Sequence, residues 1–94
     1  MLTIEEKILA VVTALEDIKA NDVTVLDTSK KSPLFERMVI ASANSPRQTR
    51  ALADHVSKQL KLRGEPALSV EGEESGEWVL VDLGDVVVHI MQPA

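Results

Sequence analysis

The sequence contains no cysteine and very few aromatic residues. Its 94 residues include one Trp, one Phe and no Tyr. Without Cys, neither a disulfide framework nor a Cys-ligated zinc site can form. This absence is consistent with a reducing compartment, and we expect a cytoplasmic protein. The length is that of one domain, so we expect a single domain over residues 1–94.

Long apolar runs and an N-terminal targeting pattern are also missing. No apolar run approaches the roughly 18–20 residues that are needed to cross a bilayer. The first six residues, Met1 to Glu6, lack the basic and then apolar pattern of a signal peptide. We therefore expect no membrane partner.

Positive charge is absent from the last third of the chain. The net charge is −5, and residues 64–94 contain seven acidic residues and no Lys or Arg. Phosphate backbones repel an acidic protein, so we expect no direct nucleic-acid specificity. Residues 47–63 carry five basic side chains, which form either a local basic patch or a solvated helix face.

Two amphipathic helices are predicted. Thr3 and Glu6 have the T-x-x-E spacing of a capping box, and apolar residues recur at helical spacing from Ile4 to Ile18. For the second helix, Ser45 is the expected cap, Pro46 suits the first position, and Gln48 is expected to close a second box. Its expected inner face is Thr49, Leu52, Ala53, Val56 and Leu60, and Gly64 ends it.

Five strands are predicted around these helices. We expect them at 23–27 (buried), 38–41, 67–70, 78–83 and 86–91, with a polar loop at 28–33 and an acidic loop at 71–77. The order is αββαβββ. The strand–helix–strand unit across 38–70 favours a parallel pair, whereas the tight last turn requires an antiparallel pair. The expected fold class is therefore α/β, a mixed five-stranded sheet with flanking helices.

The last hairpin presents two unlike faces. Gly84 suits the first central position of a two-residue type II′ turn, which sets the pairing of the two strands. One face is wholly apolar and belongs to the core. The other face carries Trp78, Leu80, Asp82, Val87, His89 and Met91. Either a helix covers this second face and its apolar residues are core, or the face is open and docks a protein.

Catalytic and metal-binding patterns are weak. Asp82 and His89 are diagonal neighbours on the second face, but no nucleophile or third ligand can be assigned beside them. Asp85 is expected to point away from Asp82, and the four glycines form no phosphate-binding loop. Asp54 and His55 are interpreted as solvated. We predict no catalytic residues, no metal site and no cofactor, and hence a protein that is not an enzyme.

The stretch from Gly76 to Met91 closely resembles the hallmark segment of the Iojap-like ribosomal silencing factors. It contains the pattern W-x-L-x-D-x-G-D-V-x-V-H, which begins at Trp78 and ends at His89. Segments 15–20, 39–41, 51–54 and 71–72 match the same family in the same order, so the resemblance spans nearly the whole chain. At two places the chain differs. Glu36-Arg37 stands where the family usually has Asp-Tyr, and the family's aromatic C-terminal helix has no counterpart after Met91.

The resemblance implies a nucleotidyltransferase-like outline without catalytic residues. It also implies binding to a large-subunit ribosomal protein at the subunit interface, which blocks joining of the small subunit and represses translation. The partner-binding residues that we expect are Trp78, Leu80, Asp82, His89, Met91 and Met38. The alternatives are a self-associating module, such as a homodimer, and a divergent nucleotidyltransferase-like enzyme.

Overall fold

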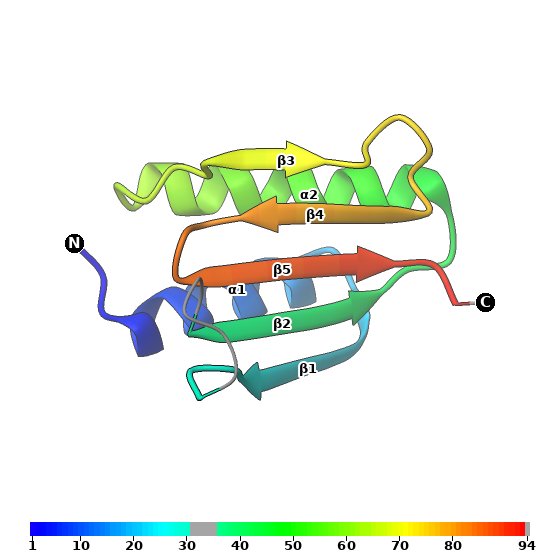
Figure 1. Cartoon of the computed structure of the whole chain (residues 1–94). Coiled ribbons are helices and arrows are strands. Elements are labelled where there is room, and N and C mark those ends of the chain that lie inside the picture. Colours follow the sequence, from blue (N-terminus) through cyan, green and yellow to red (C-terminus); the bar gives the residue numbers. More distant parts are fainter. Residues whose placement is uncertain (31–35, 94) are drawn as a thin grey trace.

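A computed structural model of the chain describes residues 1–30 and 36–93. Its elements follow the predicted order, and the predicted mixed α/β class is confirmed (Figure 1). The helices are α1 (Ile4–Asp17) and α2 (Pro46–Leu62), and the strands are β1 (Asn21–Asp27), β2 (Arg37–Ser42), β3 (Ser69–Glu71), β4 (Trp78–Asp82) and β5 (Val86–Met91). Part of the predicted polar loop, residues 31–33, lies outside the described residues.

The strands form one sheet in the order β1-β2-β5-β4-β3. β2 and β5 are parallel, and the other neighbours are antiparallel. The predicted parallel pair across residues 38–70 is therefore wrong. β2 and β3 run in the same direction, but the hairpin of β4 and β5 lies between them (Figure 1). The connection through α2 therefore skips two positions in the sheet, and β4 and β5 occupy them.

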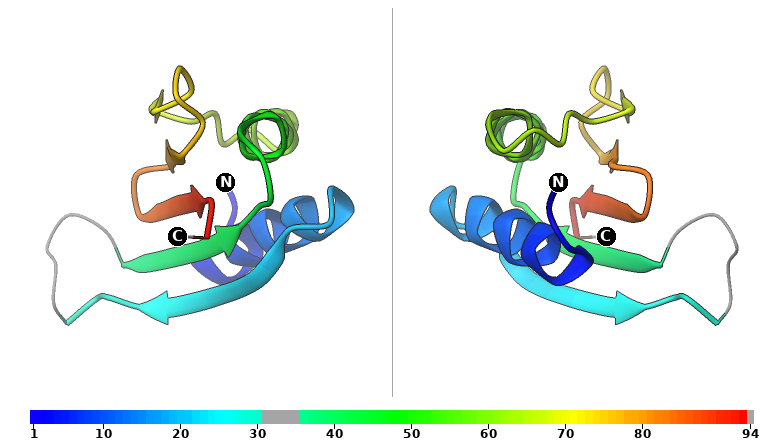
Figure 2. Two further views of the ribbon diagram at one scale, coloured as in Figure 1. Left: turned by 90° about the vertical axis from the view of Figure 1, so that its right-hand side faces the viewer. Right: turned by 90° about the vertical axis from the view of Figure 1, so that its left-hand side faces the viewer.

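Both helices lie on the same side of the sheet (Figure 2). α2 contacts β4 and β5, and α1 contacts β2 and β5. The core forms between them, where α2 contributes the predicted inner face from Thr49 to Leu60. The alternative in which a helix covers the second face of the hairpin is wrong for the part of the chain that the structure describes.

β1 was expected to be buried, and this expectation is wrong. The side chains of Val25 and Leu26 are 42% and 41% exposed, because β1 is an edge strand that pairs with β2 alone. An apolar run predicts a strand, but it cannot distinguish an edge strand from a central one.

The helix N-termini differ from each other in their capping. In α1 the predicted box is complete, since Thr3 N–H donates to Glu6 Oε1 at 2.9 Å and Glu6 N–H donates to Thr3 Oγ1 at 3.1 Å. In α2 Ser45 Oγ accepts from the amide of Gln48 at 3.1 Å. The Gln48 side chain accepts instead from the amide of Asn44 at 2.9 Å, one residue before the cap. The expected second capping box is therefore only half formed.

Lys7 is a buried cation that the sequence reading did not identify. It lies on the inner side of α1 with 5% of its surface exposed. Its Nζ lies 2.6 Å from Asp85 Oδ1, at the β4–β5 turn, and 3.5 Å from Glu65 Oε2, after α2. Burial alone would lower the pKa of Lys7, but these two carboxylates outweigh it and raise the pKa above 10.5. The ammonium thus ties α1 to both of these segments.

The inward face of β5 should control stability. We expect Val88→Ala to lower the free energy of unfolding by about 2 kcal/mol, because it leaves a cavity beneath α2. Val25→Ala is the matched control on the exposed edge strand and should cost less than about 1 kcal/mol. Urea unfolding of both variants measures the difference. Equal losses would contradict this placement of the core.

Glu65 should contribute stability that depends on pH. The amide of Leu2 donates to its carboxylate at 3.0 Å, and with Lys7 this lowers the pKa of Glu65 below 4.5. A lowered folded-state pKa stabilises the protein above the unfolded-state pKa, and the contribution is lost as the pH falls through the folded-state value. The stability difference between wild type and Glu65→Gln should therefore be largest near neutral pH and vanish in acid. Chemical unfolding across this pH range measures the difference, and a difference that stays constant with pH would contradict the contribution of Glu65.

Candidate docking surface

The side of the sheet away from the helices is a continuous, largely apolar face across all five strands. Strand register aligns its side chains in rows. The rows are Leu26–Met38–Val87–Asp82–Ser69, then Thr24–Ile40–His89–Leu80–Glu71, and then Ser42–Met91–Trp78. We call this surface the open face.

Exposure varies over the open face. The Trp78 side chain is 56% exposed, Met38, Ile40, Leu80 and Met91 are half-buried, and Val87 is covered by its neighbours. The middle is hollowed by a concavity of about 410 Å³, lined by Met38, Glu71, Leu80, Asp82, Gly84, Val87 and His89. An exposed apolar area with an acidic border suits protein docking better than it suits a monomer surface.

Contacts from α2 position the start of β4, and therefore Trp78. The buried Thr49 hydroxyl donates to the carbonyl of Gly76 at 2.6 Å, and Arg50 donates to the carbonyls of Glu73 and Glu74. Gly76 has a φ of 70°, and a Cβ there would lie 2.6 Å from the Pro46 Cβ, so glycine is required. The acidic loop before Trp78 is thus held to the helix.

Trp78 and His89 form a side-chain hydrogen bond on the open face. The indole Nε1–H donates to His89 Nδ1 at 2.9 Å, and the ring centroids are 5.6 Å apart. Indole is a donor only, so Nδ1 must be the unprotonated nitrogen of a neutral imidazole. Partial burial lowers the pKa of His89 below 6.5, which favours that neutral form.

The acidic residues near the last turn have separate partners. Asp82 Oδ1 accepts from the amide of Gly84 at 2.8 Å, whereas Asp85 binds Lys7 on the helix side. The two carboxylates diverge as predicted. Among the residues that the structure describes, no three His, Cys, Asp or Glu side chains come together as a metal site.

The structure brings all six predicted residues to the open face. Trp78, Leu80, Asp82, His89 and Met91 come from β4 and β5, and Met38 lies on β2. Sequence reasoning missed Ile40 and Leu26, which extend the apolar area to the sheet edge. Their membership depends on the parallel register of β2 and β5, for which the sequence carries no local signal. The Trp78–His89 hydrogen bond was missed as well.

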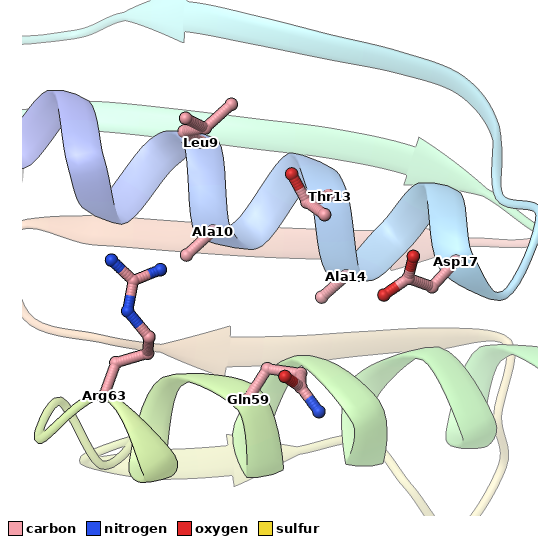
Figure 3. A pocket seen from close by; sticks show the side chains of 7 residues that line it. All are labelled: Leu9, Ala10, Thr13, Ala14, Asp17, Gln59 and Arg63. Carbon is pink, nitrogen blue, oxygen red and sulfur yellow. The ribbon is translucent and has the colours of Figure 1, made fainter.

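A second concavity lies between the helices on the far side of the molecule (Figure 3). It measures about 190 Å³, and Leu9, Ala10, Thr13, Ala14 and Asp17 of α1 line it with Gln59 and Arg63. At its edge, Asp17 Oδ2 lies 3.1 Å from His55 Nε2. The interpretation of His55 as solvated is therefore wrong, since it is half-buried and paired. This groove is smaller than the hollow of the open face and has polar ends.

The basic side chains of α2 are partly engaged. Arg50 holds the acidic loop, and Lys58 pairs with Asp54 at 3.0 Å one helical turn away. These contacts favour the solvated-face interpretation over a dedicated basic patch.

A comparison with known proteins identifies the family to which this sequence is similar. Residues 2–94 match the family model described as "Ribosomal silencing factor during starvation". The chain is 53% identical to the ribosomal silencing factor RsfS of Chromobacterium violaceum over 93 residues, which are 99% of this chain and 76% of that protein. It is 31% identical to a mouse protein named "Mitochondrial assembly of ribosomal large subunit protein 1", over 87% of this chain and 37% of that one.

Solved structures agree with the fold. A crystal structure of a Chromobacterium violaceum protein superposes with a TM-score of 0.96 at 52% identity, and covers 98% of this chain and 77% of that chain. A Bacillus halodurans structure superposes with a TM-score of 0.88 at 35% identity, and covers 94% of this chain and 82% of that chain. Within the described residues, neither helix combines the length and apolarity that a membrane span requires.

Trp78 should contribute little to folding. Because its side chain is 56% exposed, Trp78→Ala should lower the free energy of unfolding by about 1 kcal/mol or less, mostly through the lost hydrogen bond. A Trp in the core would cost about 3–5 kcal/mol. Val79→Ala, the buried neighbour on the same strand, is the control and should cost more than Trp78→Ala in urea unfolding. If Trp78→Ala unfolds the domain, the open face is not available for docking.

Proposed function

The chain belongs to the ribosomal silencing factor family, and on that premise we propose that it binds a protein of the large ribosomal subunit and thereby blocks joining of the small subunit. Membership in the family gives a role in ribosome silencing or assembly. The identity of the partner and the steric block are the proposal. The observation that supports it is the open face, an apolar sheet surface that carries the single Trp of the chain.

The open face has the make-up of a protein interface core. Aromatic and Met side chains are enriched at such cores, and here Trp78 is flanked by Met91 with Met38 on the same face. Covering Trp78, Leu80 and Met91 would remove apolar surface from water, which supplies the main driving force of association. These side chains stand on a hydrogen-bonded five-stranded sheet, so little backbone ordering is required on binding.

Charge favours a protein partner over RNA. Glu71 and Asp82 border the hollow, and residues 64–94 hold no Lys or Arg. Such a border repels phosphate and attracts a basic protein surface. A basic protein of the large subunit, exposed where the small subunit docks, has the required chemistry.

The proposed mechanism is competition for a surface. A factor that binds the free large subunit but not the joined ribosome shifts the joining equilibrium towards free subunits by mass action. Catalysis is not required, and repression scales with the fraction of large subunits that is occupied. Repression is reversed when the factor dissociates.

The two alternatives fit the site less well. Self-association through the open face would bring the acidic borders of two copies together, at a net charge of −5 each. For an enzyme, Asp82 and Asp85 would be the catalytic acids, but they point to opposite sides of the sheet and are bound to Gly84 and Lys7. Light scattering at several concentrations tests the first alternative.

Trp78→Ala should weaken binding to purified large subunits by at least about 30-fold, or about 2 kcal/mol, because central aromatic residues dominate interface energies. Co-sedimentation through sucrose measures the affinity. Leu9→Ala is the control, since Leu9 is 67% exposed on the helix side of the molecule and should bind like wild type.

The same preparation tests the mechanism and the partner. Wild type should reduce joining of small subunits in a sucrose gradient, and it should bind a protein fraction of the large subunit from which RNA has been removed. Binding to RNA-containing particles alone would contradict the proposed protein partner. Binding by Trp78→Ala at wild-type strength would remove the open face from the proposal.

A further inference from the structure

The half-exposed indole of Trp78 makes a hydrogen bond to the side chain of His89. Its side chain is 56% exposed on β4, opposite Met91. Within residues 1–30 and 36–93, the polar partner of the indole is His89 Nδ1, at 2.9 Å on the neighbouring strand β5. The orientation of the largest side chain on the open face therefore depends on the state of one imidazole.

That imidazole can accept the hydrogen bond in one state only. In the neutral ring with hydrogen on Nε2, Nδ1 has a free lone pair for the indole N–H. In the imidazolium, both nitrogens carry hydrogen, so Nδ1–H would face Nε1–H, and two donors cannot bond. A proton on His89 thus removes the polar contact of Trp78.

We propose that neutral His89 is a positioning residue that orients Trp78 on the open face, and that a proton on His89 releases the indole and weakens docking. The docking part rests on the proposed function. The orienting part concerns the protein alone. Together they make ribosome binding sensitive to acidification.

The neighbours of His89 on the adjoining strands are both charged and apolar. On β4 the charged neighbour is Asp82, on the diagonal, and its Oδ1 is already bonded to the Gly84 amide. On β3 it is Glu71, in the same row beyond Leu80. From β2, Met38 and Ile40 face this part of the sheet and carry no charge. Neither carboxylate is hydrogen-bonded to the imidazole in the described part of the chain, and burial is what shifts the pKa of His89.

The direction of the effect follows from linkage. Partial burial already lowers the pKa of His89 below 6.5, and a partner that covers the open face would bury it further. The complex therefore disfavours the proton more than the free protein does. Affinity should be greatest above the pKa of His89 in the free protein. It should fall by about tenfold per pH unit between that pKa and the lower pKa of His89 in the complex.

The first test uses the single Trp of the chain as a probe. Its fluorescence should change between about pH 8 and about pH 5, with a midpoint below the ordinary value of His. In His89→Asn, whose Oδ1 takes the place of Nδ1 as an acceptor but does not titrate, the transition should disappear. In His55→Asn, which alters the other histidine of the chain, it should remain. A transition that persists in His89→Asn, or none in wild type, overturns the orienting role.

The second test measures binding of the same variants to purified large subunits by co-sedimentation across this pH range. Dividing the wild-type affinity by the His89→Asn affinity removes any effect of pH on the ribosome itself, because both proteins bind the same subunits. The ratio should be near one at neutral pH and fall in acid by about tenfold per pH unit. His89→Leu, which fills the site without an acceptor, should bind at least about tenfold more weakly than His89→Asn at every pH. A constant ratio together with normal binding by His89→Leu overturns the docking part.

The two tests separate the inference from the function on which it rests. If wild type binds no large subunits at any pH, the proposed function fails, and the fluorescence titration still decides the orienting role. If wild type binds but the ratio stays constant, the proposed function stands and the proton dependence fails.

Discussion

Both helices of this chain pack against one side of a five-stranded sheet, and that asymmetry determines what the other side can do. Two helices of 14 and 17 residues can cover β2, β5 and β4 from one direction but cannot also enclose the sheet. The residues that alternate outward from these strands are then exposed whatever their chemistry. In this chain they are mostly apolar, and this exposed apolar area is the observation on which the proposed docking rests.

The hairpin of β4 and β5 has one face in the core and the other on the open face. Val79, Val81, Val88 and Ile90 point to the helices and are fully buried, whereas their neighbours in sequence point away. Alternation along the two strands therefore places successive side chains on opposite faces of the hairpin. Lys7 and Thr49 hold this hairpin at its two ends, through Asp85 and Gly76 respectively. The open face is thus supported by the helices without being covered by them.

The features that could be predicted from the sequence depend on local signals. Gly84 predicts the position of the turn, and the alternation of side chains along the two strands then assigns Trp78 and Val79 correctly to opposite faces. The first capping box and the inner face of α2 were likewise readable from spacing. The predictions that failed concern position within the sheet. The exposure of Val25 and the separation of β2 from β3 depend on the hairpin lying between those two strands, which no short segment encodes.

The Trp78–His89 contact shows the same limit at the level of a single bond. Hairpin parity put both residues on one face, but a diagonal pair can meet or diverge depending on side-chain rotamers, which the sequence does not specify. The sequence analysis noted Asp82 as a diagonal neighbour of His89 and predicted no catalytic or metal role for the two. The structure pairs His89 with an indole donor instead and leaves Asp82 to the turn amide. The partner of the imidazole determines which of its protonation states is favoured. Beside a carboxylate it would be stabilised as a cation, but beside an indole N–H it is required to be neutral. Under the proposed function, the histidine therefore orients the largest side chain of the open face.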